Sequence, residues 1–336
     1  MKILITAPLS DSALEKLQET GHEIDYRSWL ESGKLHMGDS LLHIIKEGLH
    51  DIVIVEGDEI KEEVLDGCEL KLIGSVRGNP HNIDVTNATA KGIPVLAAPG
   101  RNTNAVAELT ICHMLCAARK IIAAERLLQS EFFVDDFDDF ANMYTKMKGF
   151  ELQGKTVGII GLGRIGFEVA KRLRVFGMKI LVYDPYIDSD RALEANAKMV
   201  ELDELLKNSD VVTVHCKPTE ETRGMLGERE FGLMKKTAIF INTARASITD
   251  EYALLEALKT GDIAGAGLDV FSMEPVDCDN IFLELENVTI TPHIGGDTFG
   301  TVERQSEIIV TGIKAFLEGK IPHNVLNPEV FENGVL

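Results

Sequence analysis

The chain has 336 residues, a formal net charge of -20, 45% hydrophobic residues and 26% charged residues. This composition is typical of a soluble globular protein, and the length allows two domains with separate cores. The acidic excess repels nucleic-acid phosphates and anionic lipid, so nucleic acids and membrane surfaces are poor candidate partners. A small anionic substrate is still allowed, because a few basic groups can dominate the field at one site.

No targeting segment, disulfide framework or metal site is expected. The apolar run at the start of the chain is too short for a signal peptide, and no later run is long enough to span a bilayer. The five cysteines are scattered and odd in number, which favours a reducing, cytoplasmic location. Cys112 and Cys116 lie four residues apart in a predicted helix. They could share a ligand, but the favoured interpretation is two small residues buried on a core face.

The first hundred residues alternate short apolar strands with helical segments. Such alternation predicts a parallel sheet with helical crossovers. The turn after the first strand lacks glycine, so this half shows no dinucleotide site. Strands are predicted at 2–6, 23–27, 51–57, 70–76 and 92–97, and helices near 10–19 and 39–47. One long helix is predicted over 103–129.

The segment 131–148 interrupts this rhythm with aspartates and aromatic residues. One interpretation is a solvated acidic loop whose rings pack against the body of the protein. The other is an arm that packs on a second subunit. Its aromatic residues are Phe132, Phe133, Phe137, Phe140 and Tyr144.

A second alternating series follows and predicts a complete doubly wound nucleotide-binding domain. Its strands are predicted at 155–160, 179–184, 210–216, 237–244, 263–270 and 287–293. A helix over 299–318 comes after this finished sheet, so we expect it to return to the first domain and to make that domain discontinuous. An extended tail is predicted at 321–331.

Gly161, Gly163 and Gly166 form a G-x-G-x-x-G turn between a predicted strand and a predicted helix. Gly161 permits the tight turn, Gly163 lets the backbone approach a pyrophosphate, and Gly166 lets the helix lie close to the strand. Asp184 ends the next strand, where a carboxylate accepts hydrogen bonds from ribose hydroxyls and repels a 2′-phosphate. A structural turn with a coincidental aspartate is the alternative. The combination predicts NAD as the cofactor.

Four polar side chains follow successive strands of the same sheet. Arg245 follows the fourth strand, Asp269 lies at the end of the fifth with Glu274 five residues further on, and His293 ends the sixth. Taken singly, each has an ordinary interpretation: a solvated arginine, a structural histidine, a turn at a Glu-Pro pair. Because ligands bind beyond the carboxyl ends of parallel strands, the group together predicts an active site.

These residue types suit hydride transfer at a carbon that carries oxygen and lies next to a carboxylate. Arg245 would hold the carboxylate with two parallel hydrogen bonds. His293 would donate the proton to the carbonyl oxygen and remove it in the reverse direction. Glu274 would orient the imidazole and favour its protonated form. Asp269 would hold the nicotinamide carboxamide or its ribose.

The segments IIGLGRIG, NTARASITDE, AGLDVFSMEP and ITPHIGG resemble, in order and spacing, the signature segments of the D-isomer-specific 2-hydroxyacid dehydrogenases. RGNPHNIDV and GIPVLAAPGRNTNAVAELT extend the likeness over nearly the whole chain, and the phosphoglycerate dehydrogenase-like branch is most similar. The resemblance implies a Rossmann NAD-binding domain (102–298) inserted in a flavodoxin-like α/β substrate domain (1–101 plus 299–336). It also implies a homodimer.

The resemblance assigns residues segment by segment. Arg245, Glu274 and His293 fall on the catalytic positions, and Arg245 also on a substrate-binding one. The loop that holds the substrate carboxylate falls on the backbone around Val76, Arg77 and Gly78. The positions that bind the cofactor fall on Gly161, Gly163, Arg164, Ile165, Gly166, Asp184, Cys216, Pro218, Thr243, Ala244, Asp269 and the run from His293 to Gly295 and Gly296.

Three departures from the family pattern matter. Ala246 replaces the usual glycine after Arg245, which is tolerable unless the backbone there needs a positive φ. The loop 77–84 is shorter than in the phosphoglycerate enzymes, which argues against phosphoglycerate itself. The chain stops at Leu336, so we expect no regulatory domain and no serine feedback.

The sequence therefore predicts a soluble NAD-dependent dehydrogenase that interconverts a D-2-hydroxy acid and its 2-oxo acid. The alternative is an NAD(H)-sensing interaction protein similar to the corepressors of the same fold, although no partner-binding tail or basic patch supports it. Formate oxidation is disfavoured, because the family members that oxidise formate carry longer N-terminal extensions.

Overall fold

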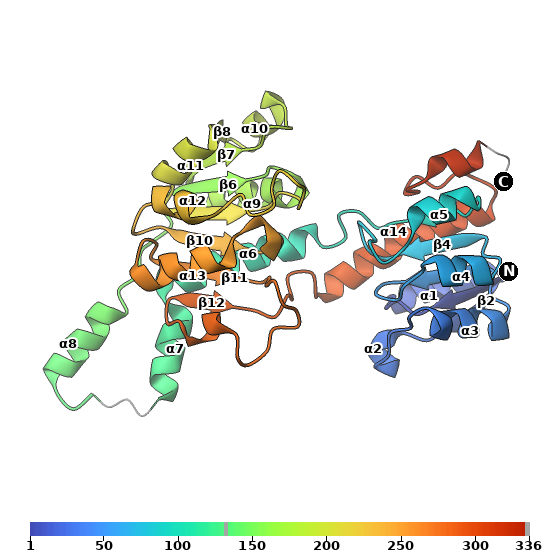
Figure 1. Cartoon of the computed structure of the whole chain (residues 1–336), viewed down its shortest axis with the longest axis horizontal. Coiled ribbons are helices and arrows are strands. Elements are labelled where there is room, and N and C mark those ends of the chain that lie inside the picture. Colours follow the sequence, from blue (N-terminus) through green and yellow to red (C-terminus); the bar gives the residue numbers. More distant parts are fainter. Residues whose placement is uncertain (131–133, 333–336) are drawn as a thin grey trace. The chain divides into compact units, whose positions relative to one another are not determined.

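The computed structural model describes residues 1–130 and 134–332. The chain divides into two compact units, Met1–Asn102 with Thr298–Leu336, and Thr103–Asp297. Each unit has its own parallel sheet covered by helices (Figure 1). The α/β fold class predicted from the alternating pattern is confirmed.

The first unit contains a five-stranded parallel sheet in the order β2-β1-β3-β4-β5. This is the flavodoxin-like order, 2-1-3-4-5. The strands are β1 (Lys2–Ile5), β2 (Glu23–Tyr26), β3 (Ile52–Val55), β4 (Leu72–Ser75) and β5 (Val95–Leu96). The helices are α1 (Asp11–Gln18), α2 (Trp29–Ser32), α3 (Asp39–Gly48), α4 (Glu62–Gly67), α5 (Val85–Ala90), α14 (Phe299–Leu317) and the 3-10 helix η3 (Pro328–Phe331).

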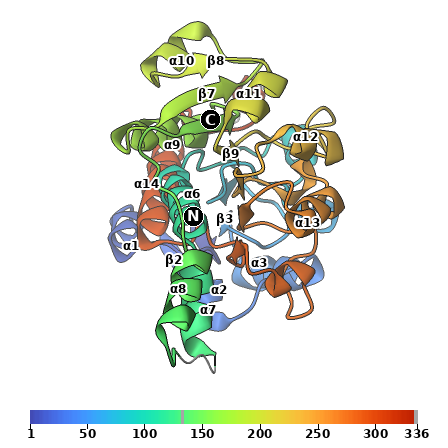
Figure 2. The same ribbon diagram turned by 90° about the vertical axis from the view of Figure 1, so that its left-hand side faces the viewer.

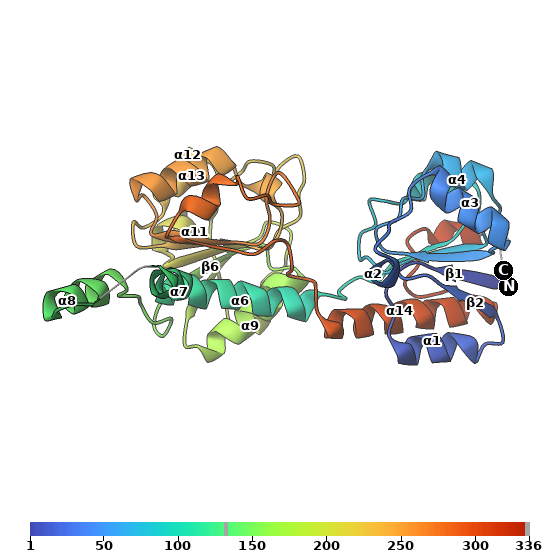
Figure 3. The ribbon, with the colours of Figure 1, turned by 90° about the horizontal axis from the view of Figure 1, so that it is seen from below.

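Both faces of this first sheet are covered, which explains why its strands are continuous apolar runs. Figure 3 shows α3 and α4 over one face and α1 and α14 over the other. Ile3 and Ile5 pack toward α1 and α14, whereas Leu4 packs toward α3 and α4. The chain's last long helix, α14, thus completes the core that its first strand begins.

The extended tail predicted at 321–331 is only partly right. Val325 pairs with Leu96 in an antiparallel bridge, and the Asn327 side chain accepts a hydrogen bond from the Val95 N–H at 2.8 Å. The chain then turns into the 3-10 helix η3, which begins with Pro328. Proline suits the first position of a helix because that position needs no N–H partner.

The second unit contains a seven-stranded parallel sheet in the order β12-β11-β10-β9-β6-β7-β8. When the seven strands are counted from β6 and the sheet is followed from β8 to β12, the order is 3-2-1-4-5-6-7. The first six are in the order of doubly wound dinucleotide-binding domains, and β12 is one further strand. The strands of this sheet are β6 (Thr156–Ile160), β7 (Lys179–Tyr183), β8 (Lys198–Met199), β9 (Val211–Val214), β10 (Ile239–Asn242), β11 (Gly265–Leu268) and β12 (Val288–Ile290). The edge strand β8 is the one that the sequence did not predict; its two residues carry no apolar run.

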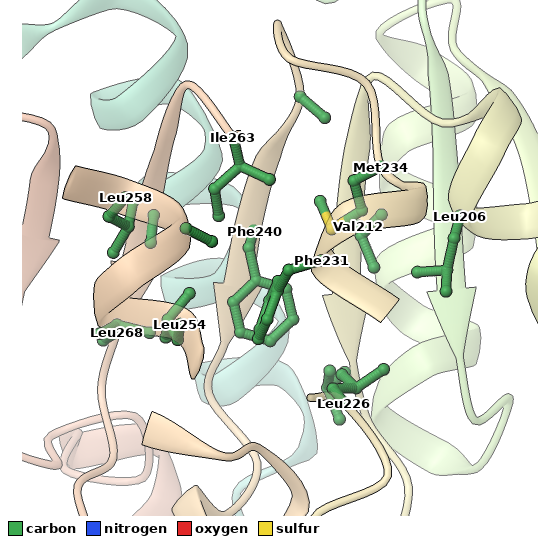
Figure 4. Packing of buried hydrophobic residues seen from close by; sticks show 14 of the residues in the cluster. Leu206, Val212, Leu226, Phe231, Met234, Phe240, Leu254, Leu258, Ile263 and Leu268 are labelled. Carbon is green, nitrogen blue, oxygen red and sulfur yellow. The ribbon is translucent and has the colours of Figure 1, made fainter. Parts of the chain in front are cut away.

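Helices cover both faces of the second sheet as well. One face packs on α6 (Thr103–Arg119) and α9 (Arg164–Val175). The other packs on α11 (Leu202–Asn208), α12 (Glu228–Leu233) and α13 (Glu251–Thr260). The core on this second face contains an edge-to-face pair of Phe231 and Phe240, whose ring centroids are 5.4 Å apart (Figure 4). The remaining elements are α10 (Ser189–Glu194) and the 3-10 helices η1 (Ala246–Ile248) and η2 (Ile281–Glu284).

The single helix predicted over 103–129 is wrong in one respect. It is broken into α6 and α7 (Ile121–Gln129) at Lys120, whose φ of 53° is left-handed. Just before this break, the carbonyl of Ala118 accepts a hydrogen bond from the Phe150 N–H at 2.9 Å. This tertiary contact has no local signal in the sequence.

The segment after α7 contains a helix, α8 (Phe137–Lys146), rather than a loop. Its N-terminal end is stabilised by the Asp136 side chain, which accepts hydrogen bonds from two backbone N–H groups of the first turn. Helices α7 and α8 extend away from the sheet of their unit (Figures 1 and 2). Phe137, Phe140 and Tyr144 are all exposed, so the interpretation of rings packed against the body is wrong for them. Phe132 and Phe133 lie outside the described residues.

The prediction that both cysteines of α6 are buried is wrong for Cys112, which is exposed, while Cys116 is half-buried. Burial, with the neighbouring Cys112, raises the pKa of the Cys116 thiol to about 11. Across residues 1–130 and 134–332, no group of three or more His, Cys, Asp or Glu side chains could hold a metal ion. Within the same residues, no helix has the length and apolar character needed to cross a membrane.

Candidate active site

The glycine turn between β6 and α9 is shaped by close backbone contacts. Gly161 has a φ of 92°, and a Cβ on it would lie 2.6 Å from the backbone nitrogen of Cys216. A Cβ on Gly166 would lie 2.1 Å from the carbonyl oxygen of Gly161. Neither position tolerates a side chain, so the sequence is glycine there for reasons of packing.

Gly163 differs, because a Cβ built on it would meet no described atom within 4 Å. It is the N-cap residue of α9, whose first N–H groups have no partner in the helix. An open backbone at a helix N-terminus is the environment that a pyrophosphate needs. The turn therefore fits NAD, and no packing contact within the described residues requires a glycine at 163.

Asp184 follows β7 and lies against the same turn. Its Oδ2 accepts a hydrogen bond from the Leu162 N–H at 2.8 Å, and its Oδ1 accepts one from the Tyr186 N–H at 3.0 Å. A carboxylate has about four acceptor positions, so Asp184 keeps capacity for ribose hydroxyls. The residue predicted to contact ribose therefore also fixes the glycine turn.

The other candidate cofactor residues follow strands whose carboxyl ends share one edge of the sheet. Cys216 and Pro218 come after β9, and Thr243 and Ala244 come after β10. Burial raises the pKa of the Cys216 thiol to about 11, so this thiol stays protonated at neutral pH. The Thr243 hydroxyl lies 2.7 Å from that of Thr110 on α6, and this pair joins the strand end to the helix.

His293 and Glu274 are brought together as predicted from their order along the chain. The His293 Nδ1 lies 2.7 Å from the Glu274 Oε2. The other carboxylate oxygen, Oε1, accepts a hydrogen bond from the Phe271 N–H at 3.0 Å. His293 is held in the left-handed region with a φ of 58°, an uncommon conformation for a residue other than glycine. Its side chain is 42% exposed, so the ring has a face open to a ligand.

Asp269 is buried, and the structure uses both of its oxygens within the chain. Oδ1 accepts hydrogen bonds from the Thr291 hydroxyl at 2.6 Å and the Ile294 N–H at 2.9 Å. Oδ2 accepts one from the Gly295 N–H at 2.8 Å. Asp269 therefore fixes the loop that carries His293. Sequence reasoning missed Thr291, which also contacts the His113 ring at 2.9 Å.

Arg245 is exposed at the carboxyl end of β10. Its Nη1 donates to the Ala244 carbonyl at 2.6 Å. The Asn242 side chain holds both ends of this loop, accepting from the Ala244 N–H at 3.0 Å and donating to the Arg245 carbonyl at 3.1 Å. Sequence reasoning did not assign this role to Asn242. Ala246 is absent from the described residues with positive φ, so the departure from glycine is tolerated as expected.

The candidate substrate loop lies in the first unit, at the carboxyl end of β4. The Val76 N–H donates to the Val55 carbonyl at 3.0 Å, and the Arg77 N–H donates to the Ser75 hydroxyl at 3.2 Å. Two of the three backbone donors named by the sequence are therefore used within the unit.

His215 directly follows β9 beside the glycine turn, and burial lowers its pKa to about 3. The unfolded chain binds a proton on this histidine below about pH 6.5, whereas the folded chain does not. Unfolding is thus favoured as the pH falls from 6.5 toward 3, by about 1.4 kcal/mol per unit. We expect His215→Gln to flatten the acid-side slope of the free energy of unfolding. Denaturant titrations at several pH values measure it, with the exposed His43→Gln as control; equal slopes in all three proteins would contradict it.

One family model and three known proteins illustrate what this chain is similar to. The model of the D-isomer specific 2-hydroxyacid dehydrogenase NAD-binding domain matches residues 111–295. A D-3-phosphoglycerate dehydrogenase from Archaeoglobus fulgidus is 39% identical over 330 residues, which cover 97% of this chain and 59% of that protein. A glyoxylate reductase from Thermococcus litoralis is 38% identical over 331 residues, which cover 98% of this chain and 97% of that protein.

Among solved structures, a D-lactate dehydrogenase from Escherichia coli matches with a TM-score of 0.77 and 27% identity, covering 97% of this chain and 100% of that one. The chain spans little more than half of the phosphoglycerate dehydrogenase but nearly all of the glyoxylate reductase. The chain therefore belongs to the D-isomer specific 2-hydroxyacid dehydrogenase family, and it is an oxidoreductase that uses NAD.

Proposed function

We propose that this protein interconverts a D-2-hydroxy acid and its 2-oxo acid. The observation that carries the proposal is the 2.7 Å pair of His293 and Glu274 at the sheet edge that also bears the glycine turn. Bound NAD supplies the chemistry of accepting and returning a hydride. The residues of the chain must then bind the acid, orient it and move one proton.

His293 is placed for the proton step. Its Nδ1 faces Glu274, so its Nε2 is the atom available to a substrate oxygen. In the reducing direction this nitrogen gives a proton to the carbonyl oxygen, which becomes the hydroxyl; in the oxidising direction it takes that proton back. Glu274 holds the ring in the tautomer and orientation that this exchange needs.

Arg245 is proposed to bind the substrate carboxylate. Its side chain is exposed at the strand end, and Asn242 fixes the backbone on both sides of it. A guanidinium binds a carboxylate through two parallel hydrogen bonds, which also fixes the face of the adjacent carbon. We further propose that the first unit, with its loop around Val76, Arg77 and Gly78, is the substrate domain.

The test is NADH oxidation with a panel of 2-oxo acids, chosen because relatives are named for glyoxylate, lactate and phosphoglycerate. We expect turnover with at least one acid, and a loss of about 10²-fold or more in kcat/KM for Arg245→Ala, since it removes a charged, bidentate contact. NADH affinity should stay unchanged. NADH binding without turnover on any acid would instead favour the NAD(H)-sensing interaction protein.

We also propose that the protein is a homodimer in which α8 packs on the second subunit. Phe137, Phe140 and Tyr144 share one face of this helix, with neighbouring ring centroids 6.0 and 5.9 Å apart. Phe137 and Tyr144 are 80% and 70% exposed, which is a costly surface for an isolated chain.

The Phe137→Glu/Tyr144→Glu double variant should therefore be monomeric by size-exclusion chromatography with light scattering. The two carboxylates that replace the rings would have to be desolvated in the interface, which opposes association. Tyr252→Glu, on an exposed ring of α13, is the matched control and should leave the mass unchanged. If the double variant has the mass of the parent protein, the α8 face is not the interface.

A further inference from the structure

Arg191 is a residue of the second unit that no motif singles out. It lies on α10, in the segment that follows β7 and Asp184. Its Nε donates to the Leu162 carbonyl at 2.6 Å, and its Nη2 donates to the Gly163 carbonyl at 3.0 Å. The guanidinium also lies over the Phe167 ring of α9, with its central carbon 4.7 Å from the ring centroid. Three contacts thus place one side chain against the glycine turn and its helix.

The two carbonyls that Arg191 holds determine where the neighbouring N–H groups point. A peptide unit is planar and trans, so a carbonyl and the N–H of the next residue point in opposite directions. The Leu162 carbonyl therefore sets the direction of the Gly163 N–H, and the Gly163 carbonyl sets that of the Arg164 N–H. These are N–H groups at the start of α9, the kind of helix end that binds phosphate groups.

Asp184 acts on the same turn from the other side of Leu162. It accepts the Leu162 N–H, while Arg191 donates to the Leu162 carbonyl. Both groups belong to the stretch of chain that begins where β7 ends. The ribose-binding end of the site and its pyrophosphate-binding turn are thus joined through one residue.

We propose that Arg191 is a positioning residue for the cofactor. By donating hydrogen bonds to the Leu162 and Gly163 carbonyls, it orients the backbone N–H groups of the turn toward the pyrophosphate. The proposal rests on the NAD-binding turn and not on the identity of the acid. An arginine near the ribose can instead bind the 2′-phosphate of NADP. Two of the guanidinium's nitrogens are already committed to carbonyls, which favours the positioning role.

The test compares Arg191→Gln and Arg191→Lys with the control variant Arg174→Gln. Arg174 is exposed near the end of α9, and its replacement by glutamine removes the same charge. NADH and NADPH dissociation constants are measured by fluorescence titration, and the melting temperature of each protein without cofactor is recorded. We expect Arg191→Gln to weaken NADH binding at least tenfold, with kcat at saturating NADH within about twofold of the parent. Arg174→Gln should match the parent.

Arg191→Lys separates charge from geometry. An ammonium keeps the charge but lacks the planar fork that spans two carbonyls, so most of the loss in NADH affinity should remain. Full rescue by lysine would show a charge effect and overturn the proposal. A loss confined to NADPH would make Arg191 a 2′-phosphate contact and also overturn it. Unchanged NADH affinity in both Arg191 variants would also overturn the proposal. Because the binding measurement needs no turnover, its outcome can be distinguished from a failure of the proposed reaction.

Discussion

Replacing His293 with Asn is expected to lower kcat by about 10²–10⁴-fold, the usual contribution of a positioned acid-base group. The Nε2 of His293 is the proposed proton donor, and an amide cannot exchange a proton at neutral pH. NADH affinity should change little, because the described contacts of the glycine turn do not involve this ring. The measurement is steady-state kinetics with saturating acid, together with a fluorescence titration of NADH.

Glu274→Gln tests whether the 2.7 Å contact with His293 matters to the same step. The amide keeps the size of the side chain but removes its charge, so we expect a smaller fall in kcat than for His293→Asn. In the double variant, the carboxylate has no ring left to orient. Its kcat should therefore equal that of His293→Asn alone. Independent, multiplicative losses would show that Glu274 acts elsewhere.

The sequence predicts those parts of the site that depend on local pattern and strand order. The glycine turn can be predicted because its three glycines lie between a strand and a helix. Close backbone contacts at Gly161 and Gly166 explain why these two positions require glycine. The pairing of His293 with Glu274 is also foreseeable, since both follow neighbouring parallel strands. Strand ends meet at one sheet edge whatever the loops between them do.

The parts that the sequence did not predict depend on contacts between distant residues. The loop after β12 brings three hydrogen-bond donors to Asp269, and this role in fixing the loop was not foreseen from the sequence. Helix α6 ends at Arg119, next to the Ala118 carbonyl that accepts a hydrogen bond from the distant Phe150 N–H. Arg191 has no motif because its partners are backbone carbonyls, which any sequence supplies.

Two glycines of the turn, Gly166 and Gly163, look alike in the sequence but have different surroundings in the structure. A Cβ on Gly166 would lie 2.1 Å from the Gly161 carbonyl oxygen, so α9 would have to move away from β6. We expect Gly166→Ala to lower the free energy of unfolding by about 1–3 kcal/mol, as overpacking of a core does, and to lower the melting temperature by several degrees. NADH binding should be lost as well, because the turn itself is displaced.

Gly163→Ala is the matched variant, with the same methyl added three residues earlier. No described atom lies within 4 Å of the added Cβ, and φ at this residue is -65°, which alanine adopts without strain. The melting temperature of the cofactor-free protein should therefore stay close to that of the parent, while NADH affinity falls at least tenfold, because the methyl occupies the approach of the pyrophosphate. Thermal unfolding without cofactor and NADH titration of both variants make the comparison. If Gly163→Ala binds NADH normally, the pyrophosphate does not approach the backbone at this residue, and the glycine turn must hold the cofactor in another way.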